Sequence, residues 1–522
     1  MRISLLISSF ALGIISFNSQ AQIAGTLYPD FGQNGRYIED FGFQDNIETV
    51  ALQDDGKVIA AGTALSQAFA GQLLVLRTNA DGTPDTQFGD NGHVIITDYT
   101  ESYAYKILIQ EDGKIVVCGA AANAQYVFSM LFFRLNTDGT IDTTFGDNGF
   151  RTTDFYSGDE YCYGATLVAG DKIVGVGSAM LPNFAVVPII MRLTADGDID
   201  TSFGIDGANL SPASSTDNTF YDVKEDNQGN LLACGYYGNG ITNEGQIDND
   251  VLLVRFADIG ALDVGFGDFG SVVIPVGSYI DAAYALVLDN SENIYLAGYT
   301  TLPDFSFDAT IIGLNPDGDL RTDFADNGIY SFDLNVQDVF NDIAYYDNNL
   351  FACGTSGGFF FDDRDFLLAS ITTVSGESNP MFTNGYSLTS IMTAFDDANA
   401  MVIDPIEESV FLAGKGNNGN SNDAAITKHL ALDIVSVTEL GNNIKLSVYP
   451  NPTSGEMIQL SVDNSLIENI SIYDSLGKTC LQFQGNSSAT VRLSLPELKA
   501  GVYSIRVETR EGKQITERLL IQ

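Results

Sequence analysis

The stretch DGTIDTTFGDNG, from Asp138 to Gly149, places three acidic residues and three glycines within twelve positions. Three kinds of structure use such residues. Closely spaced carboxylates can hold a calcium ion, two carboxyl groups can cleave a glycosidic bond, and Asp-Gly or Asn-Gly pairs form tight turns. Only the surrounding sequence can separate these alternatives.

Near-copies of this stretch recur along the chain, each with a phenylalanine at the same place. These residues are Phe31, Phe88, Phe145, Phe203, Phe266, Phe324 and Phe382. They lie 57 to 63 residues apart, and the chain after the last of them has room for one more unit, which ends at the strand-like run AAITKHL. The sequence therefore predicts seven repeat units.

Four units share an aspartate three residues before the phenylalanine and an arginine eight residues before that aspartate. The pairs are Arg77 with Asp85, Arg134 with Asp142, Arg192 with Asp200, and Arg255 with Asp263. The sixth unit has Gly313 and Arg321 at these two places, and the seventh has Ile371 and Asn379. Because both partners disappear together, we predict structural ion pairs that clamp each connector onto the last strand of its unit.

The acidic residues of the repeated motif do not form a complete calcium-binding loop. Asp196, Asp198 and Asp200 resemble the start of a calcium loop, but Thr201 and Gly207 stand where such a loop needs glycine and glutamate. We therefore predict a turn, with no metal and no cofactor, and keep a structural calcium ion as the alternative.

The sequence gives little indication of a zinc site, a serine nucleophile or a tryptophan platform for sugars. Two histidines, His93 and His429, are too few for a histidine-rich zinc site. The string GTSGG, Gly354–Gly358, matches the pattern of a nucleophile elbow, but a strand-like run follows it where a helix is needed. There is no tryptophan, which removes the commonest platform for stacking sugars.

Each unit reads as four short strands with no helical period, for example HVIITD, AYKILIQ, IVVCG and SMLFFRL. One unit cannot bury both faces of its sheet, so the units must pack against one another. A closed ring of them gives an all-β, seven-bladed β-propeller, and an open β-solenoid is the alternative. Arg36–Asp40 has no preceding unit, so we expect it to complete the sheet of Ala424–Leu430.

The regular turns should lie on one face of the ring and the irregular loops on the other. Binding residues tend to lie on variable loops held by a rigid scaffold. The aromatic candidates on these loops are Tyr126, Phe184, Tyr236, Tyr237, Phe305, Phe307, Phe359 and Phe360. They would bind a glycan or a peptide, unless they only begin the fourth strands and pack between units.

A carboxylate cluster is the second possibility on the same face. Asp40, Asp98, Asp154 and Asp333 each follow the first strand of a unit. If first strands line the channel, these carboxylates converge and could cleave a glycosidic bond; otherwise they cap loops. Two functions thus stay open: a non-catalytic binding or adhesion protein for a glycan or protein ligand, and a carboxylate-dependent glycoside hydrolase.

The bulk composition indicates an exported acidic protein. The chain has 522 residues and a formal net charge of −44, which excludes a nucleic-acid partner because phosphate binding needs basic patches. Residues 1–21 have the basic start, apolar stretch and small-residue end of a secretory signal peptide. The five cysteines are an odd number and sit among small apolar residues, so we expect no disulfide framework.

The repeats resemble a known family. The strings DGTPDTQFGDNG, DGTIDTTFGDNG and DGDIDTSFGIDG, with the turns DGKVIAAG and DGKIVVCG, are similar to the delta-60 repeats of bacterial surface proteins. The resemblance covers roughly Asp30 to Leu430 and implies a β-propeller without indicating an activity. We assign residues 22–434 to this domain.

Composition changes near Gly441. From there to Gln522 we count eight basic and eight acidic residues, so the whole negative charge belongs to the preceding part. Six short strand-like runs without the repeat predict a small Ig-like β-sandwich over residues 435–522.

This C-terminal segment resembles the type A sorting domain of type IX secretion over Val437–Gln522. The matching runs are VYPNPTSGE, SIYDSLGK and LPELKAGVYSIRV, and the motif residues are Tyr449, Pro450, Asn451, Pro452, Gly501 and Tyr503. In that family the domain directs a periplasmic cargo through the outer membrane, and the cargo is then released or attached to surface lipopolysaccharide. The resemblance implies the outer-membrane secretion machinery as a partner and a secreted or cell-surface location.

Overall fold

The computed structural model describes residues 24–156, 158–211, 217–242, 245–334, 336–358, 364–380, 382–431, 446–449, 453, 457–462, 465–473, 478–495, 498–499, 501–510 and 514–521. The predicted signal peptide, Phe359, Phe360 and Pro450 to Pro452 lie outside these residues. The described part is built from strands, with one short 3-10 helix, η1 (Thr383–Gly385). It contains no helix long and apolar enough to cross a membrane.

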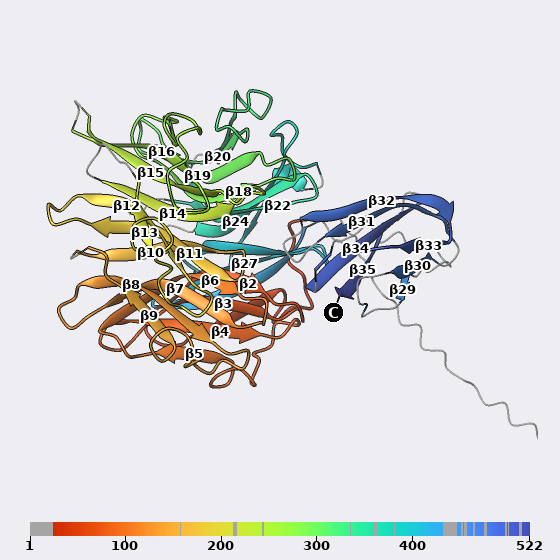
Figure 1. Cartoon of the computed structure of the whole chain (residues 1–522), viewed down its shortest axis with the longest axis horizontal. Coiled ribbons are helices and arrows are strands. Elements are labelled where there is room, and N and C mark those ends of the chain that lie inside the picture. The colour runs from red at the N-terminus through yellow and green to blue at the C-terminus, as the bar shows by residue number, and fades with distance from the viewer. Residues whose placement is uncertain are drawn as a thin grey trace, which may run out of the picture.

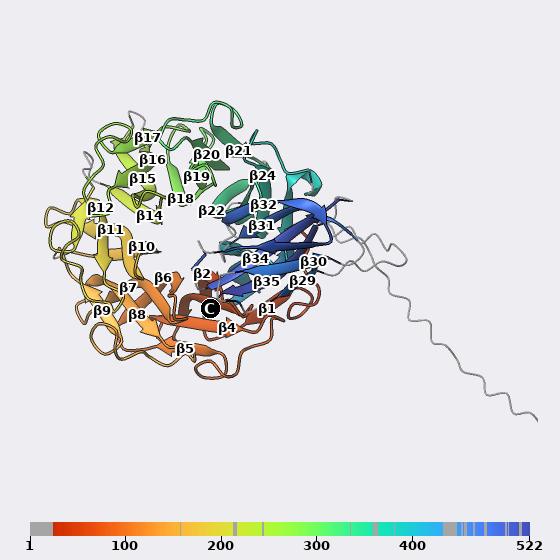
Figure 2. The same ribbon diagram turned by 45° about the vertical axis from the view of Figure 1, so that its right-hand side comes forward.

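Most strands form antiparallel groups of four that stand in a ring, as Figure 2 shows. The first group is β2 (Asp45–Leu52), β3 (Val58–Leu65), β4 (Gly71–Thr78) and β5 (His93–Ile96). The second is β6 (Glu101–Ile109), β7 (Ile115–Ala122), β8 (Phe128–Leu135) and β9 (Phe150–Thr153). The third is β10 (Glu160–Val168), β11 (Lys172–Met180), β12 (Val186–Leu193) and β13 (Ala208–Leu210).

The remaining groups continue the same order around the ring. The fourth is β14 (Asn218–Glu225), β15 (Leu231–Ile241), β16 (Ile247–Phe256) and β17 (Ser271–Ile274). The fifth is β18 (Asp281–Leu288), β19 (Ile294–Thr301), β20 (Phe307–Leu314) and β21 (Ile329–Phe332). The sixth is β22 (Gln337–Tyr346), β23 (Asn349–Gly357), β24 (Arg364–Thr372) and β25 (Tyr386–Thr389), and one parallel bridge links β20 to β22. The last is β26 (Asp397–Asp404), β27 (Ser409–Asn417), β28 (Asn422–Leu430) and β1 (Arg36–Glu39).

The strand order within each group fixes which residues face the centre. The inner strands β2, β6, β10, β14, β18, β22 and β26 contact one another in sequence, and β26 contacts β2 to close the ring. The strand that follows the acidic motif is instead the outermost strand of the preceding group, as β5 is in the first. Each group therefore combines three strands of one repeat with the first strand of the next.

The two ends of the ring are joined as expected from the sequence. Strand β1 pairs antiparallel with β28, and Tyr37 lies opposite Ile426. The preceding segment adds further backbone hydrogen bonds, including Gly25 N to Leu430 O at 2.8 Å. The prediction that the N-terminal strand completes the sheet of Ala424–Leu430 is confirmed.

His429 is buried where the two ends of the ring join. It makes the free energy of unfolding depend on pH. Its Nδ1 lies 2.9 Å from the Gly25 carbonyl oxygen and its Nε2 lies 2.9 Å from Thr427 Oγ1. Burial lowers the pKa of His429 to about 4. The unfolded chain takes up this proton near pH 6.5, about the ordinary value, so protonation between these two pH values favours unfolding.

We expect the free energy of unfolding to fall by roughly 2–3 kcal/mol through His429 alone when the pH drops from 7 to 4.5. Urea unfolding of the wild type and His429→Gln at both pH values measures this term as the difference between their pH dependences. His93→Gln, on the outer strand β5, is the matched control for the replacement of a histidine. A wild-type pH dependence in His429→Gln would contradict this assignment.

The core lies between neighbouring groups of strands. The repeated phenylalanines are all buried, and each belongs to an apolar cluster of its own, for example Phe88 with Leu73, Ile107 and Leu131. Asn148 and Gly149 in the opening motif have φ angles of 55° and 101°, which is the turn geometry expected of an Asn-Gly pair. The five cysteines are free thiols, and all but Cys480 are buried.

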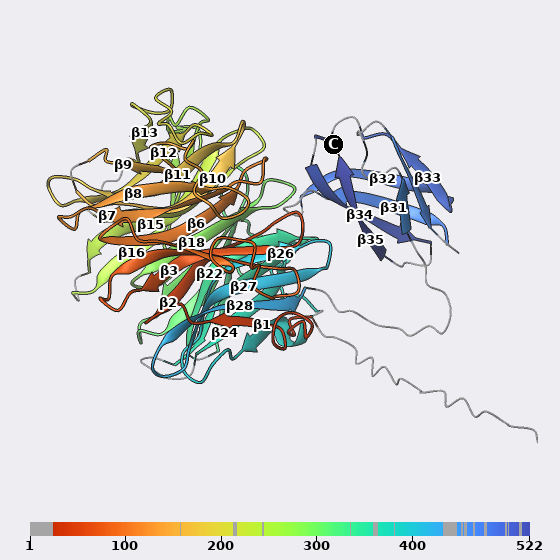
Figure 3. The same cartoon turned by 90° about the horizontal axis from the view of Figure 1, so that it is seen from below.

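The C-terminal segment forms two sheets that share one apolar core, which includes Leu460, Ile470 and Ile505. One sheet contains β29 (Leu446–Tyr449), β30 (Ile458–Val462) and β33 (Thr490–Leu493). The other contains β32 (Thr479–Ser488), β31 (Ile467–Tyr473), β34 (Gly501–Thr509) and β35 (Gln514–Ile521). Figure 3 shows these sheets beside the ring.

Candidate functional site

The two faces of the ring carry different connections. The turn face bears the short β2–β3 type hairpins, such as residues 53–57, and the loop face bears the β3–β4 type connections, such as residues 66–70. A cavity of about 870 Å³ lies at the centre of the ring. Its lining includes Phe307, Gly358 and Arg364, which stand at strand ends next to the loop face.

A β-bulge at one repeated position turns a side chain of every inner strand into this cavity. In β6, for example, the register with β7 shifts between Ala104 and Lys106, which leaves Tyr105 unpaired. A glycine on the second strand makes the bulge possible. A Cβ atom on Gly119 would lie 1.8 Å from the carbonyl oxygen of Tyr103, so no other residue fits. The same clash occurs at the matching glycine of every group.

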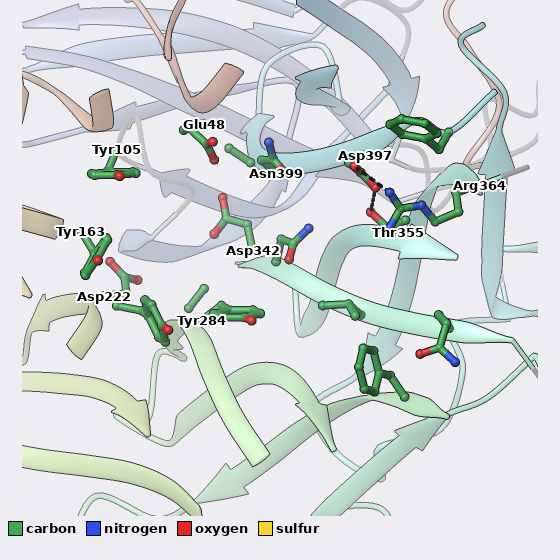
Figure 4. A pocket seen from close by; sticks show the side chains of 18 of the residues that line it. Glu48, Tyr105, Tyr163, Asp222, Tyr284, Asp342, Thr355, Arg364, Asp397 and Asn399 are labelled. Carbon is green, nitrogen blue, oxygen red and sulfur yellow. Dashed lines mark hydrogen bonds and ion pairs between the residues drawn. The ribbon is translucent and has the colours of Figure 1, made fainter. Parts of the chain in front are cut away.

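The bulge residues divide the channel wall into two halves. They are Glu48, Tyr105, Tyr163, Tyr221, Tyr284, Asn341 and Asn399 in chain order. Consecutive strands β6, β10, β14 and β18 supply the tyrosines, and β22, β26 and β2 supply the polar residues. In Figure 4, Tyr105 and Tyr163 lie on one side of the cavity and Arg364 and Asp397 on the opposite side.

The four tyrosines form a continuous tyrosine arc, defined as Tyr105, Tyr163, Tyr221 and Tyr284. Neighbouring ring centroids are 5.0, 5.6 and 5.0 Å apart along it. Further aromatic rings adjoin the arc: Tyr103, Phe128, Tyr161, Tyr236, Tyr299 and Phe307. Burial raises the pKa of each arc phenol, so all four stay protonated at neutral pH and can donate hydrogen bonds.

The polar half contains two carboxyls, Glu48, whose pKa is shifted, and Asp397, whose charge is balanced by two cations. Burial raises the pKa of Glu48 to about 7. Asp397 contacts Arg364 at 3.3 Å and Lys415 at 3.1 Å, and accepts a hydrogen bond from Thr355 at 3.1 Å. At neutral pH this half therefore offers a partly protonated carboxyl beside a closed ion-pair cluster.

A layer of charged residues follows the bulge residues on the inner strands. Lys106 Nζ lies 3.7 Å from Asp222 Oδ1, and Lys224 Nζ lies 2.6 Å from Asp222 Oδ2. Although burial opposes its ionisation, the charges of both lysines lower the pKa of Asp222. Asp222 raises the pKa of Lys106 in turn. Burial raises the pKa of Asp342, which accepts hydrogen bonds from Ile343 N and Met401 N.

The expected carboxylate cluster does not form at the channel. Asp40, Asp98, Asp154 and Asp333 are exposed and follow β1, β5, β9 and β21, which are the outermost strands of their groups. The condition for their convergence, that first strands line the channel, is not met, because each first strand joins the outer edge of the preceding group. The channel carboxyls are Glu48, Asp222, Asp342 and Asp397 instead.

The predicted loop aromatics fall into three kinds. Tyr126, Phe184 and Phe305 are exposed at the tips of loop-face connections, each with a positive φ angle. Tyr236 and Tyr237 pack within the ring, where Tyr236 lies 6.0 Å from Tyr221 and Tyr237 joins an apolar cluster between groups. Phe307 lines the channel. An exposed aromatic that the sequence reading missed, Phe69, lies at the equivalent tip of the first group.

Sequence reading also missed the tyrosine arc. A signal was present, since four consecutive repeats carry tyrosine at the same place, in AYKIL, CYGAT, FYDVK and AYALV. The glycine that permits the bulge recurs as well, in VCG, GVG, ACG and LAG. Only the strand order shows that this place faces the channel.

The arginine–aspartate pairs lie away from the channel, beside the acidic connectors. The four guanidinium-to-carboxylate contacts are 2.8 Å for Arg77 and Asp85, 2.7 Å for Arg134 and Asp142, 2.9 Å for Arg192 and Asp200, and 2.8 Å for Arg255 and Asp263. Each arginine also donates to a backbone carbonyl of the next connector, as Arg134 does to Ala195 O at 2.7 Å. In the sixth unit Arg321, at the aspartate position, reaches Thr373 O in the same way.

The C-terminal sheets contact the turn face, as Figure 1 shows from the side. Arg506 on β34 is buried against the ring, where it contacts Asp347 at 3.2 Å and Glu408 at 2.8 Å and donates to the Tyr346 hydroxyl. All three partners belong to turn-face hairpins. Of the predicted sorting residues, Tyr449 is exposed and the Tyr503 hydroxyl donates to Lys499 O. The loop face thus lies on the side of the ring away from the C-terminal domain.

Comparison with known families agrees with this division of the chain. Residues 447–522 match the family described as the secretion system C-terminal sorting domain. Residues 53–88, 110–145 and 171–203 match the family described as a domain of unknown function (DUF5122) beta-propeller.

Similarity to individual proteins is distant. A 107-residue stretch is 29% identical to an endo-acting ulvan lyase of Formosa agariphila; it covers 20% of this chain and 20% of that protein, so the chain matches only a fifth of that relative's length. Among solved structures, the ulvan lyase of family PL25 has a TM-score of 0.40, 10% identity and coverage of 79% of this chain and 95% of that chain. The beta-propeller domain of the Trilobed protease from Pyrococcus furiosus has a TM-score of 0.38, 10% identity and coverage of 75% and 95%.

The sorting-domain match accounts for export. A chain with this domain interacts with the type IX secretion machinery and reaches the cell surface or the extracellular space. The repeat matches and the strand groups account for the rest of the fold. The chain is therefore a secreted β-propeller protein that carries a type IX secretion sorting domain at its C-terminus.

Proposed function

We propose that this protein is a non-catalytic extracellular binding protein whose ligand, a glycan or a protein segment, enters the central channel from the loop face. In this proposal the ring is a seven-bladed propeller and the C-terminal sheets are an Ig-like sorting domain. The observation that carries the proposal is the division of one channel wall into four tyrosines and three polar residues. An aromatic surface with a few polar groups opposite is typical of ligand pockets.

The position of the sorting domain supports the same proposal. It contacts the turn face through Arg506, so it leaves the loop face open for ligand before and after export. Exposed aromatic residues at the loop tips, including Phe184 with 81% of its surface accessible, surround that face. The ion-pair clamps belong to the scaffold in this account, because they join connectors and lie outside the cavity lining.

A second candidate function rests on the channel carboxyls. The pKa of Glu48 is raised to about 7, whereas that of Asp222 is lowered. Two carboxyls with pKa values pushed apart are what a glycoside hydrolase uses as acid and base. Glu48 would donate the proton and Asp222 would stay ionised. Against this, Asp222 is already occupied by Lys106 and Lys224.

A screen of the full chain against immobilised polysaccharides and peptides tests the proposal. We expect retention of a ligand without release of reducing sugar. Glu48→Gln should still retain that ligand within about threefold of the wild-type affinity, because a neutral amide replaces a carboxyl that is about half protonated at neutral pH. Release of reducing sugar by the wild type that Glu48→Gln abolishes would instead establish the hydrolase.

A further inference from the structure

The geometry of the tyrosine arc indicates what kind of ligand surface it can contact. Its rings tilt against one another by 56°, 55° and 71°, so successive faces and edges form a curved wall and not a flat stack. Tyr161 stacks parallel to Tyr163 within 6°, at a centroid distance of 5.6 Å, and all four arc residues line the cavity. Such a wall offers apolar ring faces and protonated phenol donors side by side.

The charges around the channel are already matched. Of the described residues that line it, the cations are Lys106 and Arg364, and each contacts a carboxylate, Asp222 and Asp397 respectively. The other two lining carboxyls, Glu48 and Asp342, both have pKa values raised by burial. An anionic ligand would meet no free cation there, and a cationic ligand would meet carboxyls that are held toward their neutral form.

We infer that the ligand of this channel is an uncharged saccharide, which rests on the proposed function above. Its apolar C–H faces would pack on the tyrosine arc, and its hydroxyl groups would exchange hydrogen bonds with the arc phenols on one side and with Glu48, Asn341 and Asn399 on the other. A cavity of about 870 Å³ is large enough for a ligand of several sugar rings. The formal net charge of −44 also repels the acidic polysaccharides that compete with neutral ones.

Titration calorimetry of the full chain with four classes of probe tests this inference. The probes are neutral gluco-, manno- and galacto-oligosaccharides, sulfated or uronate oligosaccharides, tetramethylammonium, and an unstructured peptide. We expect a neutral oligosaccharide to bind with a Kd that stays the same at low and high salt, because screening acts only on charges.

Substitutions at Tyr163, in the middle of the arc, locate the contact. Tyr163→Ala should weaken binding at least about tenfold, and Tyr163→Phe, which keeps the ring but removes the phenol donor, should weaken it by about two- to tenfold. Tyr126→Ala, at an exposed loop tip, is the matched control and should bind like the wild type. Thermal unfolding of each variant shows whether the ring is intact, and Tyr163→Phe keeps the test valid if Tyr163→Ala does not fold.

The possible outcomes separate the inference from the proposed function. Binding of only the anionic oligosaccharides, the ammonium ion or the peptide would overturn the saccharide inference and leave the binding function standing. Neutral sugar binding that survives Tyr163→Ala unchanged in a folded variant would place the site elsewhere and overturn the inference as well. If no probe of any class binds the wild type, the inference and the proposed binding function both fail.

Discussion

Asp142→Ala is expected to destabilise the propeller by about 3–5 kcal/mol, because it removes the buried counter-charge of the Arg134 guanidinium and leaves the contact with Asp196 at 3.3 Å, whose side chain is largely exposed. Arg134 is 3% exposed and Asp142 5% exposed. Although burial opposes ionisation, hydrogen bonds from Thr144 and Lys114 and the charge of Arg134 lower the pKa of Asp142. The Asp142 carboxylate is thus ionised throughout the neutral range. Denaturant unfolding of the wild type and Asp142→Ala measures the decrease in the free energy of unfolding.

A double-mutant cycle separates the ion pair from other losses. Adding Arg134→Ala to Asp142→Ala should cost much less than a second full penalty, with a coupling of roughly 1–3 kcal/mol. Asp147→Ala in the same motif is the matched control, because its side chain is 84% exposed and surface changes stay within about 0.5 kcal/mol. Additive losses in the cycle would return the acidic motif to the possible functional sites.

Deletion of residues 437–522 is expected to abolish export almost completely, with the propeller retained in the periplasm. The deleted segment contains the whole sorting-domain match, 447–522. The polar contacts of this domain with the ring include Asn227, Asn290, Tyr346, Asp347 and Glu408, all on the turn face. The deletion should therefore leave the inner strands and the channel in place. Immunoblots of periplasm, cell surface and medium measure the distribution.

Two controls make this result interpretable. The retained propeller should resist limited proteolysis like the wild type, which shows that it folds without the tail. Residues 437–522 fused to an unrelated periplasmic protein should direct that protein out of the cell. Normal surface or medium levels of the truncated chain would show that another part of the sequence carries the export signal.

The repeat architecture was readable from the sequence because each unit repeats the same local chemistry. Buried Phe145 and the turn at Asn148 and Gly149 are fixed within a few residues of one another, so their spacing survives in every copy. The partnership of Arg134 with Asp142 was readable for the same reason, since one connector joins them. The pairing of β1 with β28 could be predicted because the first strand has no preceding unit and the last unit lacks a fourth strand of its own.

The channel could not be read in the same way. Which strand of a unit is innermost depends on how the whole ring closes, so the sequence left open which strand lines the channel. Asp40 and Asp98 would face the channel only if first strands lined it, and the strand order places them at the outer edge instead. The bulge at Tyr105 also breaks the two-residue alternation that marks inward-facing side chains. The recurrence of tyrosine at the place of Tyr163 was a signal, but Glu48 gave none, because a lone glutamate on a strand usually belongs to the surface.

Tyrosine fluorescence tests the central claim, that the ligand lies in the channel, most directly. The chain has 23 tyrosines and no tryptophan, so its emission comes from tyrosine alone, including the arc. During titration with a neutral oligosaccharide we expect a saturable change in the wild type and in Tyr126→Ala, and its loss in folded Tyr163→Ala. An undiminished saturable change in Tyr163→Ala, or its loss in Tyr126→Ala alone, would contradict the account and place the ligand on the loop tips or elsewhere.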